Sequence, residues 1–158
     1  MRLKAILIVA LSLACSLRPA DALDLPDIIK DRLATTQKLC TDHGGKAGAA
    51  ADITVTTIDV DGNGHNDFIL DYSKLACDGV PDMYCGGGFC TIDVYTWRSN
   101  NAWKLLLVAS VADWKIVGTG KKRAFILTQS GSFCGKPKKR TCTVTYTFAN
   151  GSMHGKMK

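Results

Sequence analysis

The chain has 158 residues and a formal net charge of +6, with 20 Lys and Arg against 14 acidic residues, all of them Asp. This length suits a single domain with a modest core. Because Glu is absent, an acid/base pair of carboxylates would have to come from Asp alone. No dinucleotide-binding, P-loop, G-x-S-x-G or H-E-x-x-H motif is present either. The composition therefore favours a protein that is not an enzyme.

Residues 1–22 have the organisation of a secretory signal peptide. Arg2 and Lys4 give a positive start, an apolar run follows, and Ala20-Asp21-Ala22 supplies the small residues that signal-peptide cleavage needs. The apolar run is shorter than the ~20 residues of a stable transmembrane helix, so cleavage is favoured over an uncleaved anchor. We therefore expect a mature domain, residues 23–158, without a transmembrane segment, in the bacterial periplasm or secreted.

Cysteine usage indicates an oxidising compartment. Cys15 falls within the signal peptide, where lipidation is an alternative to its removal. No C-x-x-C pair of the kind that binds zinc is present, and an even number of Cys in a small exported domain predicts three disulfides. The six Cys of the mature domain are Cys40, Cys77, Cys85, Cys90, Cys134 and Cys142.

Charge is divided between the two halves of the chain. Residues 23–83 hold eleven Asp and five Lys or Arg, whereas residues 84–158 hold two Asp and twelve Lys or Arg. Such a division suits self-complementary packing or a molecule with two faces. The basic runs 121–123 and 136–140 are interpreted as solvated turns, or alternatively as a patch for lipopolysaccharide or an acidic glycan. No nucleic-acid partner is expected, because exposed aromatic residues do not alternate with the charges. The candidate binding residues are Lys136, Lys138, Lys139 and Arg140.

Residues 24–40 are predicted to form one helix. Asp24 is a candidate N-cap, and Pro26 suits the first turn. Gly44-Gly45 predicts where the segment closes. Residues on one face at helical spacing, expected to pack on the rest of the domain, are Leu25, Ile29, Leu33, Thr36 and Cys40.

Everything after Ala51 is predicted to form strands. The last of them alternates most clearly, with Thr at its odd-numbered positions on one face and apolar residues on the other. We expect the apolar face in a core and the threonine face toward water or a partner. The predicted strands are 53–60, 68–72, 90–97, 103–111, 114–117, 124–129 and 141–148.

Two stretches resemble each other, which predicts a repeated unit. Residues 68–73 (FILDYS) resemble 125–130 (FILTQS), and a Cys follows each Ser by four residues. Residues 90–97 likewise resemble 142–148 with one residue missing. The predicted fold is therefore mainly β: an antiparallel meander of about seven or eight strands with one N-terminal helix, sandwich or barrel-like, in two units of about 52–111 and 112–158.

The repeat restricts the disulfide pattern. An equivalent bridge in each unit pairs Cys77 with Cys90 and Cys134 with Cys142, and leaves Cys40 to Cys85. The alternative pattern pairs Cys85 with Cys90 and Cys40 with Cys77.

Residues 59–67 (DVDGNGHND) form the most specific motif. Oxygen-bearing side chains stand at positions one, three, five and nine, and the two Gly permit a tight turn. Ca²⁺ prefers about six to eight oxygen ligands, so the spacing predicts a calcium site. Leu70 replaces the bidentate Glu of an EF-hand, which excludes that motif. The alternative is a bare hairpin turn. The candidate ligands are Asp59, Asp61, Asn63, the backbone carbonyl of His65, and Asp67.

This loop resembles the calcium loop of FG-GAP and related VCBS repeats, in which D-x-[DN]-G-[DN]-G-x-x-D joins two strands of a propeller-like blade. The four oxygen-bearing side chains match its ligand positions, and Phe68-Ile69-Leu70 match the strand that follows. The resemblance covers about twenty of the 158 residues and implies a structural Ca²⁺ in the first unit. In the second unit, residues 118–122 carry basic residues instead. Two units are too few for a propeller, which needs about four blades or more.

The predicted function is an exported, calcium-stabilised, non-enzymatic binding or envelope-associated module, whose partner is a cell-envelope polymer or protein. The alternative is a small secreted or periplasmic inhibitor of a hydrolase that inserts a disulfide-held loop. Tyr84 and Phe89 flank three Gly between Cys residues and are candidate contact residues. Asp71 and Asp93 lie within predicted strands, either as a facing pair or, as favoured, at solvent-facing positions.

Overall fold

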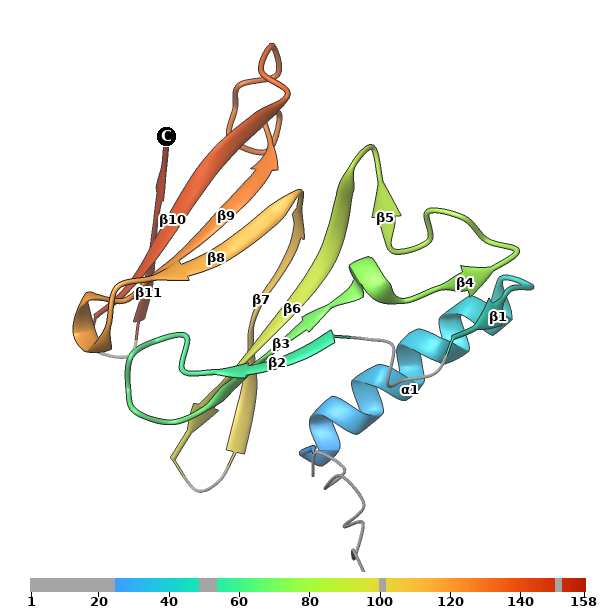
Figure 1. The fold of residues 1–158 in the computed structure, drawn as a ribbon, viewed down its shortest axis with the longest axis horizontal. Helices are drawn as coiled ribbons and strands as arrows, with labels where there is room; N and C mark the ends of the chain where they lie inside the picture. Colours follow the sequence, from blue (N-terminus) through green and yellow to red (C-terminus); the bar gives the residue numbers. More distant parts are fainter. Residues whose placement is uncertain (1–24, 49–53, 100–101, 150–151) are drawn as a thin grey trace, which may run out of the picture.

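The computed structural model describes residues 25–48, 54–99, 102–149 and 152–158. The predicted signal peptide, with Cys15, and the predicted cap Asp24 lie outside these residues. The described chain is mainly β with one helix, as the sequence predicts. Figure 1 shows the arrangement: the helix lies beside a central sheet, and a second sheet lies on the other side of that sheet.

The central sheet is antiparallel throughout. Its strand order is β2-β3-β6-β5, and β7 pairs along the length of β6. A β-bulge in β7 shifts the pairing between Val94 and Tyr95 of β6. The 3-10 turn η2 (Tyr72–Lys74) follows β3. The strands are β2 (Thr54–Ile58), β3 (Asp67–Asp71), β5 (Cys85–Gly86), β6 (Phe89–Arg98) and β7 (Ala102–Val111).

The second sheet has the order β11-β10-β9-β8 and is also antiparallel. Only Ala112 separates β7 from β8, so one run of chain pairs first with β6 and then with β9. The Ala112 N–H donates to the carbonyl of Thr128 at this corner (2.7 Å). The elements are β8 (Asp113–Val117), η3 (Gly120–Lys122), β9 (Ala124–Ser130), β10 (Thr141–Ala149) and β11 (Ser152–Met157).

The prediction of seven or eight strands is too low, because eleven strands lie in the described residues. Three of the additional ones, β1 (Lys46–Ala47), β4 (Cys77–Asp78) and β5, contain two residues each. Strands of two residues are too short to leave a periodic pattern in the sequence. The fourth, β11, has no apolar alternation because it is an exposed edge strand.

The helix α1 (Asp27–Asp42) begins and ends close to the predicted positions. Pro26 occupies the N-cap position, and its side chain makes no capping bond. Gly44, with φ +80°, leads the chain away at the other end, as the double glycine predicts. Four of the five residues on the predicted face are buried, and they are Ile29, Leu33, Thr36 and Cys40.

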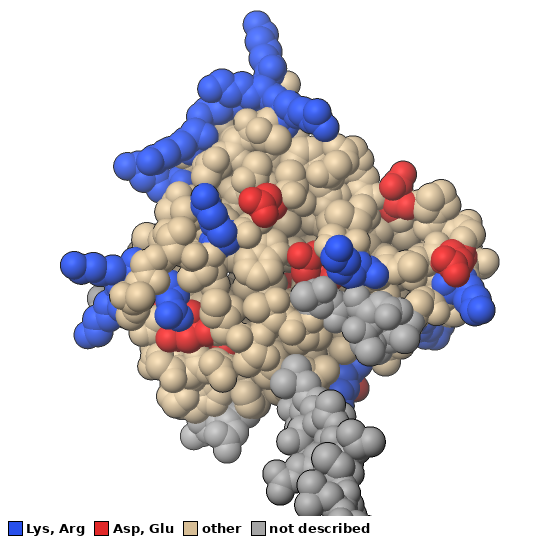
Figure 2. Space-filling model, in the orientation of Figure 1, with Lys and Arg blue, Asp and Glu red and all other residues tan. Residues whose placement is uncertain are grey.

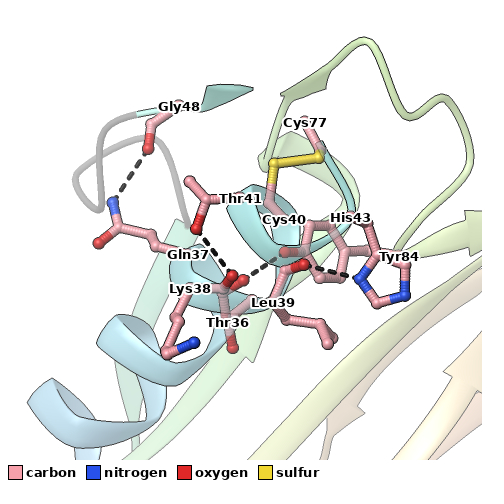
Figure 3. Close-up of a disulfide and its surroundings, with 10 residues drawn as sticks. All are labelled: Thr36, Gln37, Lys38, Leu39, Cys40, Thr41, His43, Gly48, Cys77 and Tyr84. Carbon is pink, nitrogen blue, oxygen red and sulfur yellow. Dashed lines mark hydrogen bonds between the residues drawn. A yellow bond between two sulfur atoms is a disulfide. The ribbon is translucent and has the colours of Figure 1, made fainter. Parts of the chain in front are cut away.

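Figure 3 shows how the second half of α1 is fastened. Cys40 is bonded to Cys77 of β4. The side-chain amide of Gln37 donates to the carbonyl of Gly48 (3.0 Å), and the Tyr84 hydroxyl donates to the carbonyl of Thr36. Two of these contacts, with Cys77 and Tyr84, hold the helix to segments 37 and 48 residues away along the sequence.

Two hydrophobic cores lie on opposite faces of the central sheet. Between this sheet and α1, Ile29 and Leu33 pack against Phe68, Leu70 and Tyr95. The other core lies between the two sheets and holds Val60, Ile69, Ile92, Val94, Ala109, Val111, Phe125 and Leu127. Strand β3 is thus covered on both faces, which explains its continuous apolar sequence.

The two predicted units have the same topology. Strands β2-β3-β6-β7 and β8-β9-β10-β11 are successive four-stranded meanders. In the first, Phe68 lies opposite Tyr95, and in the second Phe125 lies opposite Tyr146. Phe68 faces α1, whereas Phe125 faces the central sheet. The units therefore stack with equivalent faces pointing in the same direction.

The favoured disulfide pattern is wrong for two of its three bridges. The structure pairs Cys40 with Cys77, Cys85 with Cys90, and Cys134 with Cys142. Cys85 and Cys90 lie directly opposite each other in the β5–β6 hairpin, so they pair with each other. The hairpin turns at Gly87-Gly88, where both φ angles are positive and Gly is favoured. Only Cys134–Cys142 follows the repeat as predicted.

Candidate functional site

The predicted calcium loop brings its three carboxylates together between β2 and β3. Ligand oxygens of Asp59, Asp61 and Asp67 all lie within 4.8 Å of one another. Asp59 and Asp61 are mostly buried, and Asp67 is fully buried. The spacing in the sequence thus translates into a compact group of negative charge.

Backbone N–H groups shape this loop. The carboxylate of Asp59 accepts from the N–H groups of residues 62–64 at 2.6–3.2 Å. The amide oxygen of Asn63 accepts from the N–H of His65 at 2.7 Å. The side chain of His65 stacks on Trp97, with ring centroids 3.7 Å apart. The His65 ring therefore packs on β6 rather than joining the carboxylates.

Asp67 connects the loop to the central sheet. Its two oxygens accept from the N–H of Val60 and the N–H of Trp97, each at 2.8 Å. Burial raises the pKa of Asp67 to about 6, and the Asp61 charge adds to this effect, while the two N–H bonds oppose it. A buried carboxylate beside two others is costly in its charged form without a cation.

The equivalent loop of the second unit supplies one cation. Arg123 follows η3, lies 3.2 Å from a carboxylate oxygen of Asp59, and donates to the Asp59 carbonyl. Both side chains are more than 80% buried. The acidic loop of one unit and the basic loop of the other therefore meet at this ion pair.

The residues fit a divalent cation. Three carboxylates with one guanidinium leave two negative charges at a partly buried position. The oxygens of carboxylates, an amide and the backbone are the ligands that Ca²⁺ prefers. The hydrogen bonds from backbone N–H groups would also stabilise a turn without an ion. The observation that favours an ion is therefore the excess negative charge of the loop.

A substitution tests the contact between the loops. At Gly62 a Cβ atom would collide with the carbonyl oxygen of Gly120, whereas at Gly64 a Cβ meets nothing within 4 Å. Both Gly have positive φ, so Ala is strained at either position. We expect Gly62→Ala to lower the free energy of unfolding by about 2 kcal/mol more than Gly64→Ala, measured by urea denaturation. Equal losses in the two variants would show that the loops do not touch.

The pH dependence of stability reports on Asp67. Its folded pKa of about 6 lies above the ordinary value of 3.8. The folded state therefore binds a proton that the unfolded chain releases, and stability falls as the pH rises through this window. In chelator we expect a loss of roughly 2 kcal/mol between pH 4 and 6.5, measured by denaturant midpoints, and Asp67→Asn removes this slope. Saturating Ca²⁺ should also remove it, because the ion favours the charged carboxylate. A slope unchanged in Asp67→Asn contradicts the assignment.

The predicted basic residues lie in a projecting loop between β9 and β10, which we call the basic tip and define as residues 131–140. Figure 1 shows this loop extending beyond the end of the second sheet, and Figure 2 shows Lys and Arg gathered there. Lys138, Lys139 and Arg140 are exposed, and Lys136 is half-buried. The bridge Cys134–Cys142 closes the loop.

The basic tip also carries an aromatic residue that was not among the predicted site residues. Phe133 is 64% exposed, more than any other large hydrophobic side chain in the described ranges. Its sequence signal is weak, because a single Phe among Gly, Ser and Cys has no periodicity. A lone apolar residue in an otherwise polar loop is the only indication.

Tyr84 and Phe89, the candidate contact residues beside the glycine loop, are half-buried. Tyr84 stacks on Tyr72 and donates to α1, so it has a packing role, and burial raises the pKa of its hydroxyl. The glycine loop does adjoin the basic tip, because the Arg140 guanidinium lies beside Gly88. Tyr84 therefore packs against α1, and the glycine loop itself borders the charged surface.

The predicted strand carboxylates Asp71 and Asp93 do not face each other. Asp71 accepts from the Trp114 indole N–H (3.0 Å) on the face toward the second sheet. Asp93 is fully buried on the opposite face, so its expected solvent-facing position is wrong. It accepts from Arg32 (2.6 Å) and from the Tyr72 hydroxyl (2.7 Å). Asp93 raises the pKa of Arg32, whereas burial, together with Asp93, raises the pKa of the Tyr72 hydroxyl.

Beside this group, a groove of about 470 Å³ lies between α1 and the segment before β5. Arg32, Tyr72 and Tyr84 contribute to its lining.

The three His lie elsewhere: His43 is exposed at the end of α1, His65 stacks on Trp97, and His154 is exposed in β11. The groove thus combines a guanidinium with two phenols, and none of the His residues lines it.

Comparisons with known proteins give no relative: no protein family, no curated protein and no solved structure matches the chain. Across the residues that the structure describes, no helix combines the length and apolar character that crossing a membrane requires. Three disulfides are typical of proteins from oxidising compartments. The acidic loop and the basic tip are therefore the features of the molecule that indicate a function.

Proposed function

We propose that this chain is exported to the periplasm or secreted, and is a non-enzymatic binding module that contacts an anionic polymer or protein of the cell envelope. The observation that carries the proposal is the charge of the second unit. After Asp113 the chain holds ten Lys or Arg and no acidic residue. Four of these ten lie in the disulfide-closed basic tip. A concentrated positive patch attracts polyanions.

A matched pair of variants tests the proposal. Lys138→Gln/Lys139→Gln removes two charges from the basic tip, and Lys121→Gln/Lys122→Gln removes two from η3, where both side chains are also exposed. On a column carrying an anionic polysaccharide at low salt, we expect the tip variant to elute much earlier than the η3 variant. Equal elution of both variants would show that net charge alone determines retention, and no retention of the native protein would refute an anionic polysaccharide as the partner.

The proposed module includes a structural Ca²⁺ held by Asp59, Asp61, Asn63 and Asp67. The excess negative charge of the loop supports this, and the FG-GAP and VCBS resemblance points the same way. The ion would compensate the buried Asp67 and fix the β2–β3 connection. Calorimetric titration of the native protein and of Asp61→Asn tests it. If Ca²⁺ gives neither heat of binding nor thermal stabilisation, the loop is a hairpin turn without an ion.

An inhibitor of a hydrolase is a second candidate, because the basic tip is a projecting loop closed by a disulfide. Such a loop can enter a cleft without losing much conformational entropy. One result would favour this function over surface binding. The native protein would inhibit a hydrolase at a one-to-one ratio, and both Phe133→Ser and Lys138→Gln/Lys139→Gln would lose this inhibition.

A further inference from the structure

We infer that the partner of the basic tip is an anionic lipid membrane, into whose head-group region the tip inserts Phe133. The inference rests on the binding role proposed above for the basic tip, and it goes beyond the polymer or protein partner proposed there. Its starting observation is the coincidence of the most exposed large hydrophobic side chain with the densest cluster of cations. Basic residues attract anionic head groups, while an aromatic ring partitions into the membrane interface.

The tip is pre-organised for this contact. Cys134–Cys142 joins it to the start of β10. Inside it, the N–H of Lys136 donates to the carbonyl of Gly131 (2.7 Å), and the N–H of Lys139 donates to that of Lys136 (2.9 Å). The N–H of Gly131 in turn donates to the carbonyl of Arg140 (3.1 Å). Phe133 is thus presented by a loop that loses little conformational entropy on binding.

The position of the tip favours a membrane over a soluble polyanion. A chain-like polyanion is usually held in a groove that follows its backbone. The tip instead projects beyond the second sheet, with cations around it (Figures 1 and 2). A projecting end reaches a flat surface without obstruction from the rest of the molecule. Long Lys and Arg side chains can then keep their charges at the head groups while the ring enters more deeply.

Co-sedimentation with vesicles is the first test. The native, disulfide-bonded protein is mixed with vesicles of phosphatidylcholine containing phosphatidylglycerol, and with vesicles of phosphatidylcholine alone. We expect binding to the anionic vesicles only. Phe133→Ser should weaken it about tenfold, and each Lys→Gln at positions 138 and 139 about fivefold. Met157→Ser, an exposed apolar residue on β11, should change binding less than twofold.

A Trp at the tip reports insertion directly. The emission of Phe133→Trp, corrected for that of the native protein, should shift to shorter wavelength with anionic vesicles and stay unchanged with heparin. Vesicle binding that is equal in native protein and Phe133→Ser would overturn the membrane inference. Retention on an anionic polysaccharide in that case preserves the proposed function. Absence of binding to both vesicles and polysaccharide at low salt overturns both.

Discussion

Replacing Cys40 and Cys77 together by Ala should be the most damaging removal of a disulfide, with a loss of about 4 kcal/mol in the free energy of unfolding. The two Cys are 37 residues apart, so their bridge restricts the unfolded chain more than the others do. Cys85 and Cys90 are 5 residues apart, and their removal should cost about 2 kcal/mol. Chemical denaturation of both double variants measures the difference.

Two controls separate the stabilising effect of the cross-link from the effect of removing a buried Cys side chain. The reduced native protein should lose about as much stability as double-Ala variants of all three bridges combined, apart from the cavities that Ala leaves at the buried Cys40 and Cys142. Mapping of peptides under non-reducing conditions should give Cys40 joined to Cys77. A peptide containing Cys40 joined to Cys85 would restore the pattern that the repeat predicts and contradict the structure.

The second large effect is expected at Arg32, which compensates the buried Asp93. Asp93 is 0% exposed and Arg32 37%, and the second oxygen of Asp93 has no hydrogen-bond partner in the described part of the chain. Arg32→Met therefore leaves a buried carboxylate supported by Tyr72 alone, and we expect a loss of about 3 kcal/mol. Lys38→Met, in the exposed pair with Asp42 on the same helix, should cost less than about 0.5 kcal/mol.

The second unit supplies the rescue for this experiment. Its residue equivalent to Asp93 is Val144, because both lie opposite the Leu of the repeated FIL sequence. Val144 is buried without a charged partner. The double variant Arg32→Met/Asp93→Val should therefore recover most of the stability that Arg32→Met loses. A double variant no more stable than the single one would mean that Arg32 contributes through packing of its aliphatic part.

Sequence patterns predicted the features that depend on local spacing. The buried face of α1 follows from helical periodicity, and the alternation in β10 does place Val144 in the core and Thr147 in water. The group of Asp59, Asp61 and Asp67 follows from one short loop, whose members are held close together by the chain itself. None of these predictions needs knowledge of which elements pack on one another.

The missed features depend on contacts between distant segments. The alternation in β6 predicts that Asp93 and its apolar neighbours point to opposite faces of the sheet. Only the packing of α1 shows that the face carrying Asp93 is covered. Arg123 meets Asp59 because two equivalent loops touch, and their opposite charges were the available signal. The repeat misassigned Cys77 because β4 pairs with β1 beside the helix and has no counterpart in the second unit.

The stacking of the two units leaves the molecule with two different outer faces. One could not accept a further unit, and the other could. On the first of these faces, α1 covers the side of the central sheet on which a preceding unit would have to pack. At the other end the outer face of β10 carries Thr143, Thr145 and Thr147, which tolerate water and also suit packing. Duplication of the second unit could therefore lengthen such an array in one direction only, with each added sheet covering the threonines of the one before it.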